Sequence, residues 1–153
     1  MAMTETAVRK SVTVEVPVDK AFRVFTDGMD GWWTRDHHIG SADLDHVVLE
    51  PRAGGRWYEV GVDGSECDWG RVLEWDPPER LVLAWQIGSN WQYDPDLLTT
   101  VEVRFVSVSP ERTRVELEHR DLDGFGDAEE EMRANFDSGG GWKGLLDRFA
   151  AAV

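Results

Sequence analysis

The sequence predicts an α+β domain in which a curved antiparallel sheet of about six to seven strands wraps around a long C-terminal helix. Three observations support this fold class. Segments in which apolar and polar residues alternate recur along most of the chain, between turn residues such as Asp63-Gly64 and Pro77-Pro78. One or two short helical patterns follow the first such segment. The final segment, Trp142 to Ala152, has helical spacing and is long enough to cover the sheet.

The first strand and helix are indicated by local periodicity. Valines alternate with polar residues over 11–16, which is typical of a half-buried strand. Apolar residues then recur at spacings of three and four over 18–25, which predicts a short helix. Asp27-Gly28 ends this helix. A further helical turn is expected over 29–35, and a polar loop over 35–45.

The middle of the chain is expected to be a meander of antiparallel strands, because its strand-like segments are short and joined by brief turns. The expected strands cover 46–50, 56–62, 66–76, 80–87, 100–109 and 113–121. In the strand over 80–87, four apolar residues share one face, namely Leu81, Leu83, Trp85 and Ile87. Alternation is lost after Phe105, and either a β-bulge there or a covered outer face would explain this loss.

The end of the chain changes to a helical period. Its apolar stripe consists of Met132, Phe136, Gly139, Trp142, Leu146 and Phe149. Gly139-Gly140-Gly141 interrupts this stripe, and each glycine costs roughly 1 kcal/mol relative to alanine in a helix. We therefore expect a break or kink at the glycines, with Trp142 to Ala152 as the secure helix. Because a pocket would open at this point, residues 139–142 are a candidate gate.

Composition limits the classes of partner. The chain has 153 residues, which suits a single domain over 1–153. Its 30 acidic and 16 basic residues give a net charge of -14, which disfavours nucleic acid and anionic membranes. Cys67 is the only cysteine, so no intramolecular disulfide is expected. Met1 to Lys10 is mostly polar and has no apolar core of a signal peptide, so a cytoplasmic protein is expected.

Six motifs, together with this order of elements, carry a resemblance to a known family. They are VPVDKAFRVFTD at 16–27, WW at 32–33, PRAGGRW at 51–57, GRVLEWDPPERLVLAW at 70–85, TRVELEH at 113–119 and GWKGLLDRF at 141–149. The chain resembles the START/SRPBCC superfamily and, within it, the family named for homologues of the activator of the Hsp90 ATPase. The resemblance implies a helix-grip (START-like) fold with a cavity between the sheet and the C-terminal helix.

The resemblance does not imply one activity, because similar proteins include carriers of lipids or hydrophobic ligands as well as cyclases. Chaperone activation is not carried over, since that activator has a further N-terminal domain. This chain also departs from the family pattern. The acidic run Asp127 to Glu131 and the three glycines lie where an unbroken helix would be expected.

The concave face of the sheet is the expected ligand site. Five tryptophans lie between positions 57 and 91, and their indoles either fill the core or line an aromatic pocket with N–H groups that orient a ligand. His119 is expected to face inward, as a ligand-binding or acid–base group or as a satisfied structural histidine. Glu59 and Arg71 also fall on inward faces, where they would pair, lie at a wet pocket mouth, or reveal a register shift of one residue. The predicted ligand-binding residues are Trp33, Trp57, Glu59, Trp69, Arg71, Leu83, Trp85, Phe105, His119, Phe136 and Trp142.

Metal, cofactor and nucleophile signatures are weak. Asp36, His37 and His38 are adjacent, but no second cluster has ligand spacing. We expect this histidine pair on a mobile loop at the pocket entrance. The three glycines lack the Lys-Ser/Thr ending of a phosphate-binding loop, and no G-x-S-x-G motif occurs. We therefore expect no metal, no cofactor and no catalytic nucleophile.

Three functions follow from these observations. The first is a domain that binds a small hydrophobic or aromatic molecule, and this non-enzymatic role is favoured. The second is a cyclase or hydratase that uses His119 and Glu59 as an acid–base pair. The third is a chaperone-linked or other partner-binding domain, which predicts a filled core and an exposed apolar patch around Trp32 or Trp91. Exposed edge strands favour a homodimer.

Overall fold

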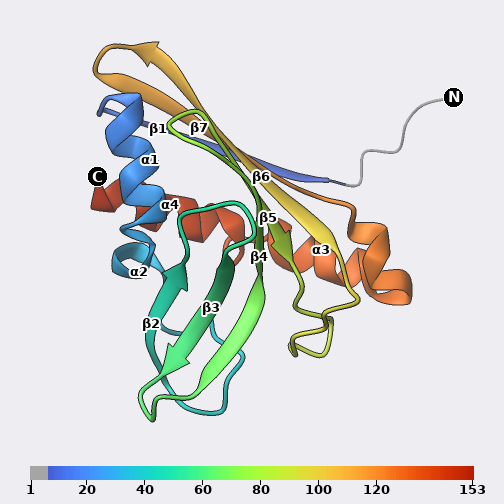
Figure 1. Cartoon of the computed structure of the whole chain (residues 1–153). Helices are drawn as coiled ribbons and strands as arrows, with labels where there is room; N and C mark the ends of the chain where they lie inside the picture. The colour runs from blue at the N-terminus through green and yellow to red at the C-terminus, as the bar shows by residue number, and fades with distance from the viewer. Residues whose placement is uncertain (1–6) are drawn as a thin grey trace, which may run out of the picture.

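A computed structural model describes residues 7–153 and shows one sheet with helices against it (Figure 1). The elements are β1 (Val8–Val14), α1 (Val18–Thr26), α2 (Met29–Trp32), β2 (Leu44–Leu49), β3 (Arg56–Gly61), β4 (Glu66–Asp76), β5 (Arg80–Trp85), β6 (Thr99–Ser109), β7 (Arg112–Arg120), the 3-10 helix η1 (Leu122–Ala128), α3 (Glu129–Asp137) and α4 (Trp142–Ala152). Residues 1–6, which begin the polar N-terminal segment noted above, lie outside the described part. The predicted α+β helix-grip fold is confirmed.

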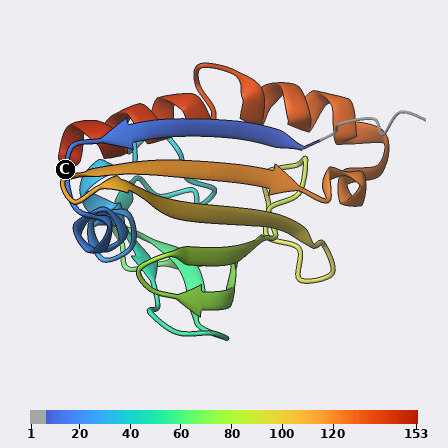
Figure 2. The same cartoon turned by 90° about the horizontal axis from the view of Figure 1, so that it is seen from above.

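The sheet has seven antiparallel strands in the order β1-β7-β6-β5-β4-β3-β2. The strands from β2 to β7 therefore pair with their neighbours in sequence, as expected for a meander. The N-terminal strand β1 instead pairs with β7, with Val12 opposite Val115. Figure 2 shows α3 and α4 lying end to end along one face of the sheet, beside β1. The concave face thus receives its cover from the C-terminal helices.

The core is filled at the end of the molecule where α1, α2 and α4 meet the sheet. The ring of Phe25 lies at its centre, with centroids 5.1 Å from Trp32, 5.6 Å from Phe105 and 5.3 Å from Phe149. The contacts with Phe105 and Phe149 are edge to face, and such contacts add roughly 0.5–1.5 kcal/mol per pair beyond the burial of area. This aromatic packing anchors α4 on the sheet, and the pocket described below lies nearer the α3–α4 break.

The break at the glycines is present, as predicted. Helix α3 ends at Asp137 and α4 begins at Trp142, so the C-terminal helical segment is not continuous. The N–H of Gly141 donates to the carbonyl of Ser138 (2.9 Å). A Cβ atom on Gly141 would collide with the carbonyl oxygens of Asn135 and Phe136. A glycine is required there because the chain folds back onto the last turn of α3.

The prediction that Arg71 faces the core is wrong. Trp57 pairs with Gly70 and Tyr58 with Asp68, so Trp69 is an extra residue in β4. Such a β-bulge reverses the alternation that follows it. Arg71 is therefore exposed on the outer face, where its guanidinium donates to Gln86 Oε1 (3.2 Å).

The bulge expected near Phe105 lies further along the strand than predicted. Phe105 keeps its inward position, and the register of β6 against β7 shifts between Ser107 and Ser109. Val108 is 50% exposed, so a covered outer face does not account for the lost alternation there. The first strand was expected over 11–16, whereas β1 begins at Val8 and ends at Val14.

The convex face of the sheet carries an ion-pair network around Glu102. This carboxylate is 5% exposed and lies 2.6 Å from Arg80, 3.0 Å from Arg104 and 2.6 Å from Arg120. Burial alone would raise the pKa of Glu102, but hydrogen bonds from the three guanidinium groups lower this pKa to about 2. The network thus pairs the buried carboxylate of Glu102 with cations on that face. Within residues 7–153, none of the helices is both long enough and apolar enough to cross a membrane.

Candidate functional site

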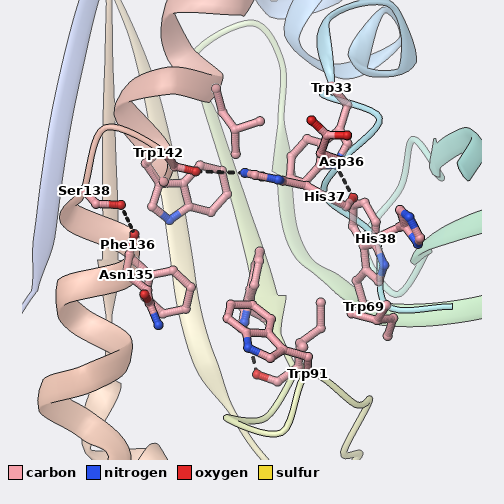
Figure 3. Close-up of a pocket in the computed structure, with 16 residues that line it drawn as sticks. Trp33, Asp36, His37, His38, Trp69, Trp91, Asn135, Phe136, Ser138 and Trp142 are labelled. Atoms are coloured by element: carbon pink, nitrogen blue, oxygen red, sulfur yellow. Dashed lines mark hydrogen bonds between the residues drawn. The ribbon is translucent and has the colours of Figure 1, made fainter. Parts of the chain in front are cut away.

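An open pocket of about 440 Å³ lies between the sheet and the break that separates α3 from α4 (Figure 3). Three parts of the chain meet around it. Asp36, His37 and His38, from the loop between α2 and β2, lie on one side, and Phe136 and Trp142 lie on the other. The third part is β5 with the loop after it, which contributes Trp85 and Trp91. The pocket therefore forms where elements distant in the sequence come together.

The wall of the pocket is aromatic. Trp33 packs on Trp69 with ring centroids 4.9 Å apart, and Trp85 packs on Trp142 at 5.8 Å. Phe136 completes the wall, 5.3 Å from Trp85. All five belong to the predicted ligand-binding set, and all five line the pocket. Each is anchored by a strand or helix or directly follows one, which holds its ring in place.

The indole N–H groups of this wall are not available to a ligand. Each of the four tryptophans donates its N–H to an acceptor within the protein. These acceptors are the His37 carbonyl for Trp33 (2.9 Å), Glu59 Oε1 for Trp69 (2.8 Å), the Ile87 carbonyl for Trp85 (3.2 Å) and His119 Nδ1 for Trp142 (3.1 Å). The expectation that these N–H groups orient a ligand is therefore wrong for the four wall indoles, which present carbon surfaces.

His119 faces inward, as predicted, and lies behind the wall. Its Nε2 is 2.8 Å from Thr99 Oγ1, and that hydroxyl donates to the carbonyl of Trp85 (2.9 Å). Since the hydroxyl proton goes to the carbonyl, Nε2 carries the ring proton and Nδ1 accepts from Trp142. Burial lowers the pKa of His119 to about 3, so the ring is uncharged. Both nitrogens are satisfied by the protein.

Glu59 is also buried and holds the rim of the pocket. Its Oε1 accepts from the Ile39 N–H (2.6 Å) and the Trp69 indole (2.8 Å), and its Oε2 accepts from the Gly40 N–H (3.1 Å). Three N–H groups thus compensate the buried carboxylate in place of a cation. The structure does not bring Glu59 and His119 together, and neither side chain lines the pocket.

The rim is formed by polar loop residues. His37 Nε2 donates to the Gly140 carbonyl (2.8 Å), which links the loop after α2 to the α3–α4 break. His38 Nδ1 donates to the Gly40 carbonyl (3.0 Å). The histidine pair lies at the pocket, as predicted. Among residues 7–153, no group of three His, Cys, Asp or Glu side chains is arranged to hold a metal ion.

Trp91 is a pocket residue that the predicted ligand-binding set omits, although it was expected either among the indoles that fill the core or line a pocket, or in an exposed patch. It lies in the loop between β5 and β6, is 44% exposed and has a φ of 61°. This left-handed conformation costs about 1–2 kcal/mol for a residue other than glycine, which suits a position with a functional constraint. A large aromatic in the polar stretch Ser89 to Pro95 was the available signal. Trp32, the other outer-surface candidate, is buried.

The remaining predicted residues form a second layer or lie elsewhere. Leu83 and Phe105 are buried in the core, and Arg71 is on the outer face. Trp57 is fully buried and contacts Trp33, Trp69 and Trp85 edge to face at 6.2, 5.5 and 5.7 Å. Its Nε1 has no hydrogen-bond acceptor among the described residues. Trp57 therefore supports the aromatic wall from behind.

Comparison with known proteins gives one family and close structural likenesses. A family model described as "Activator of Hsp90 ATPase homolog 1-like protein" matches residues 15–153. The structure of an anthrahydroquino-gamma-pyrone synthase, Txn09, complexed with SUM, is 40% identical, with a TM-score of 0.67 over 96% of this chain and 96% of that chain. The self-sacrificing resistance protein CalC from Micromonospora echinospora is 31% identical, with a TM-score of 0.70 over 95% and 92% of the two chains.

A third structure, the Aha1 dimer from Colwellia psychrerythraea, is 15% identical, with a TM-score of 0.62 over 95% of this chain and 94% of that chain. This likeness shows the fold alone. No curated protein matches the chain.

Proposed function

This chain belongs to the activator of Hsp90 ATPase homolog 1-like family, and we propose that it binds a flat aromatic small molecule in the pocket beside the α3–α4 break. The observation that carries this proposal is the aromatic wall, in which four indoles and Phe136 line an open cavity of about 440 Å³. Cavities that hold small molecules have roughly 300–1,000 Å³ and are mostly apolar. The chemistry of the wall favours flat rings over other apolar ligands.

The state of the indole N–H groups supports an aromatic ligand. Because all four are already hydrogen-bonded within the protein, a ring that covers them leaves no donor unsatisfied. Rigid ring faces and edges also make offset or edge-to-face contacts with other rings, and these add to the burial of area. A flexible alkyl chain would gain the burial but not the ring contacts.

One of the structures named above agrees with this ligand class. The protein that is 40% identical is named as the synthase of an anthrahydroquino-gamma-pyrone, a name that denotes a fused-ring aromatic compound, and its structure holds a ligand. The protein that is 31% identical is named as a resistance protein. The name of the synthase concerns a small molecule, and it supports the choice of a binding function over a partner-docking surface.

The test uses native mass spectrometry and quenching of tryptophan fluorescence. Fused-ring aromatics such as 2-naphthol and 2-methoxynaphthalene should form a one-to-one complex, whereas 1-octanol should bind more weakly. The variant Asn135→Trp places an indole at the mouth of the pocket and should abolish binding. Its control is Ala134→Trp, because Ala134 is the exposed neighbour on α3 and does not line the pocket. Binding that survives in Asn135→Trp would show that the pocket is not the site.

A second candidate is a synthase or cyclase activity on such a ligand. Two observations favour it: the 40% identity to a synthase, and the titratable side chains of Asp36 and His37 at the pocket. His119 and Glu59 are poor candidates for the acid and base, since both are fully bonded within the protein. Recovery of the bound compound with unchanged mass and retention time after long incubation would favour binding alone.

A further inference from the structure

We propose that the pocket selects aromatic ligands that bring hydrogen-bond donors, such as phenolic hydroxyls, and rejects aromatic anions. This inference rests on the proposed function and specifies its ligand class. It follows from an imbalance in the polar atoms around the pocket, which are mostly hydrogen-bond acceptors. The imbalance arises because the protein itself uses most of the donors.

The rim histidines illustrate this imbalance. The partners of His37 Nε2 and His38 Nδ1 are carbonyl oxygens, at 2.8 and 3.0 Å. A carbonyl can only accept, so both of these nitrogens carry protons. In an uncharged imidazole the other nitrogen then has a free lone pair. When its ring is uncharged, each histidine therefore has one acceptor nitrogen, and both residues line the pocket (Figure 3).

Asp36 adds a negative charge to the same rim. Its carboxylate has no hydrogen bond or ion pair within residues 7–153, and the side chain is exposed at the pocket. The neighbouring cation, Arg35, lies 3.0 Å from Asp30. Asp36 can therefore accept a charge-assisted hydrogen bond from a ligand hydroxyl, and it repels a carboxylate.

In the described chain, no lysine or arginine among the residues that line the pocket compensates for the charge of Asp36. Lys143, next to Trp142, is paired with Asp147 at 2.8 Å. The protein as a whole carries a net charge of -14. An aromatic anion would lose water on entry and find no counterion, which makes its burial unfavourable.

Three groups oppose this selectivity, and their effect is smaller than that of the Asp36 carboxylate. The Asn135 amide and the Trp91 indole are donors at the exposed rim, where water competes with them for a ligand. The N-terminus of α4, beside Gly141, carries about half a positive charge. The formal charge on Asp36 exceeds that partial charge.

The experiment compares three ligands with the same ring system by isothermal titration calorimetry near neutral pH. They are 2-naphthol, which is an uncharged donor, 2-methoxynaphthalene, which can only accept, and 2-naphthoate, which is an anion. We expect 2-naphthol to bind roughly tenfold more tightly than 2-methoxynaphthalene, as a net hydrogen bond of this strength allows. We expect 2-naphthoate to bind most weakly.

Matched variants attribute this order to the rim. Asp36→Asn should strengthen the binding of 2-naphthoate and weaken that of 2-naphthol, so that their ratio changes at least fivefold. Glu111→Gln removes the same charge from the exposed β6–β7 turn and should leave the ratio unchanged. If 2-naphthoate binds as tightly as 2-naphthol, the selectivity is disproved although the pocket binds aromatics. If none of the three binds, the proposed function itself fails.

Discussion

The indole of Trp142 donates a 3.1 Å hydrogen bond to the imidazole of His119, and this bond ties the start of α4 to β7. The chain of bonds continues from His119 to Thr99 and from Thr99 to the carbonyl of Trp85. The Trp142 indole and the backbone carbonyl of Trp85, two residues of the aromatic wall, are thus linked by one buried chain of hydrogen bonds. A buried chain of this kind is stable only while every member has its partner.

The first prediction concerns the response of stability to acid. Because the pKa of His119 is about 3 in the folded protein and about 6.5 in an unfolded chain, only the unfolded state takes up this proton between those values. The free energy of unfolding should therefore fall by up to about 1.4 kcal/mol per pH unit as the pH drops below about 6.5. His119→Gln should lose this dependence. Urea unfolding of the unmodified protein and of His119→Gln, near neutral pH and near pH 5, measures this change in the free energy of unfolding. An equal pH dependence in the two proteins would refute the prediction.

The second prediction concerns the Trp142 indole. Trp142→Phe keeps an aromatic ring but leaves His119 Nδ1 without a donor, so the free energy of unfolding should fall by about 1–3 kcal/mol. The control is Trp91→Phe, at a half-exposed indole with no side-chain hydrogen bond among the described residues. Chemical denaturation compares the two variants. Equal losses would mean that the hydrogen bond to His119 contributes little.

The third prediction concerns the rim loop held by Glu59. Glu59→Gln presents one acceptor oxygen where the carboxylate offered two, so either Gly40 or the pair of Ile39 and Trp69 loses its acceptor. We expect a loss of about 1–3 kcal/mol in stability and weaker binding of 2-naphthol, because the loop also carries the rim histidines. Glu111→Gln is the control for loss of charge. Unchanged amide exchange at Ile39 and Gly40 in Glu59→Gln would contradict this role.

The fourth prediction compares two neighbouring glycines. A methyl group at Gly141 would meet the carbonyl oxygens at the end of α3, whereas nothing lies within 4 Å of a methyl group at Gly139. Gly141→Ala should therefore destabilise the protein by about 1–3 kcal/mol through crowding and distort the pocket mouth. Gly139→Ala should change stability by less than about 0.5 kcal/mol. Thermal unfolding and 2-naphthol binding check the pair, and a tolerated Gly141→Ala would show that the break can rearrange.

Local periodicity was sufficient for most of the fold. The start of α4 at Trp142, the helix α1 and the shared face of Leu81 and Leu83 were all predicted from the sequence, because burial of one face imposes a repeat on neighbouring residues. The inward orientation of His119 was predicted in the same way. Where one extra residue entered a strand, at Trp69, the repeat was broken and the predicted face of Arg71 was reversed.

The sequence by itself thus determined the order of elements, the break at the three glycines and the aromatic composition of the wall. Tertiary structure alone decided what those residues can do. Whether the Trp142 indole is free for a ligand depends on His119, which lies 23 positions away, and the rim forms only where His37 reaches Gly140, 103 positions along the chain. Hydrogen bonds between distant residues leave no repeat in the sequence, because they depend on how the elements pack and not on local spacing.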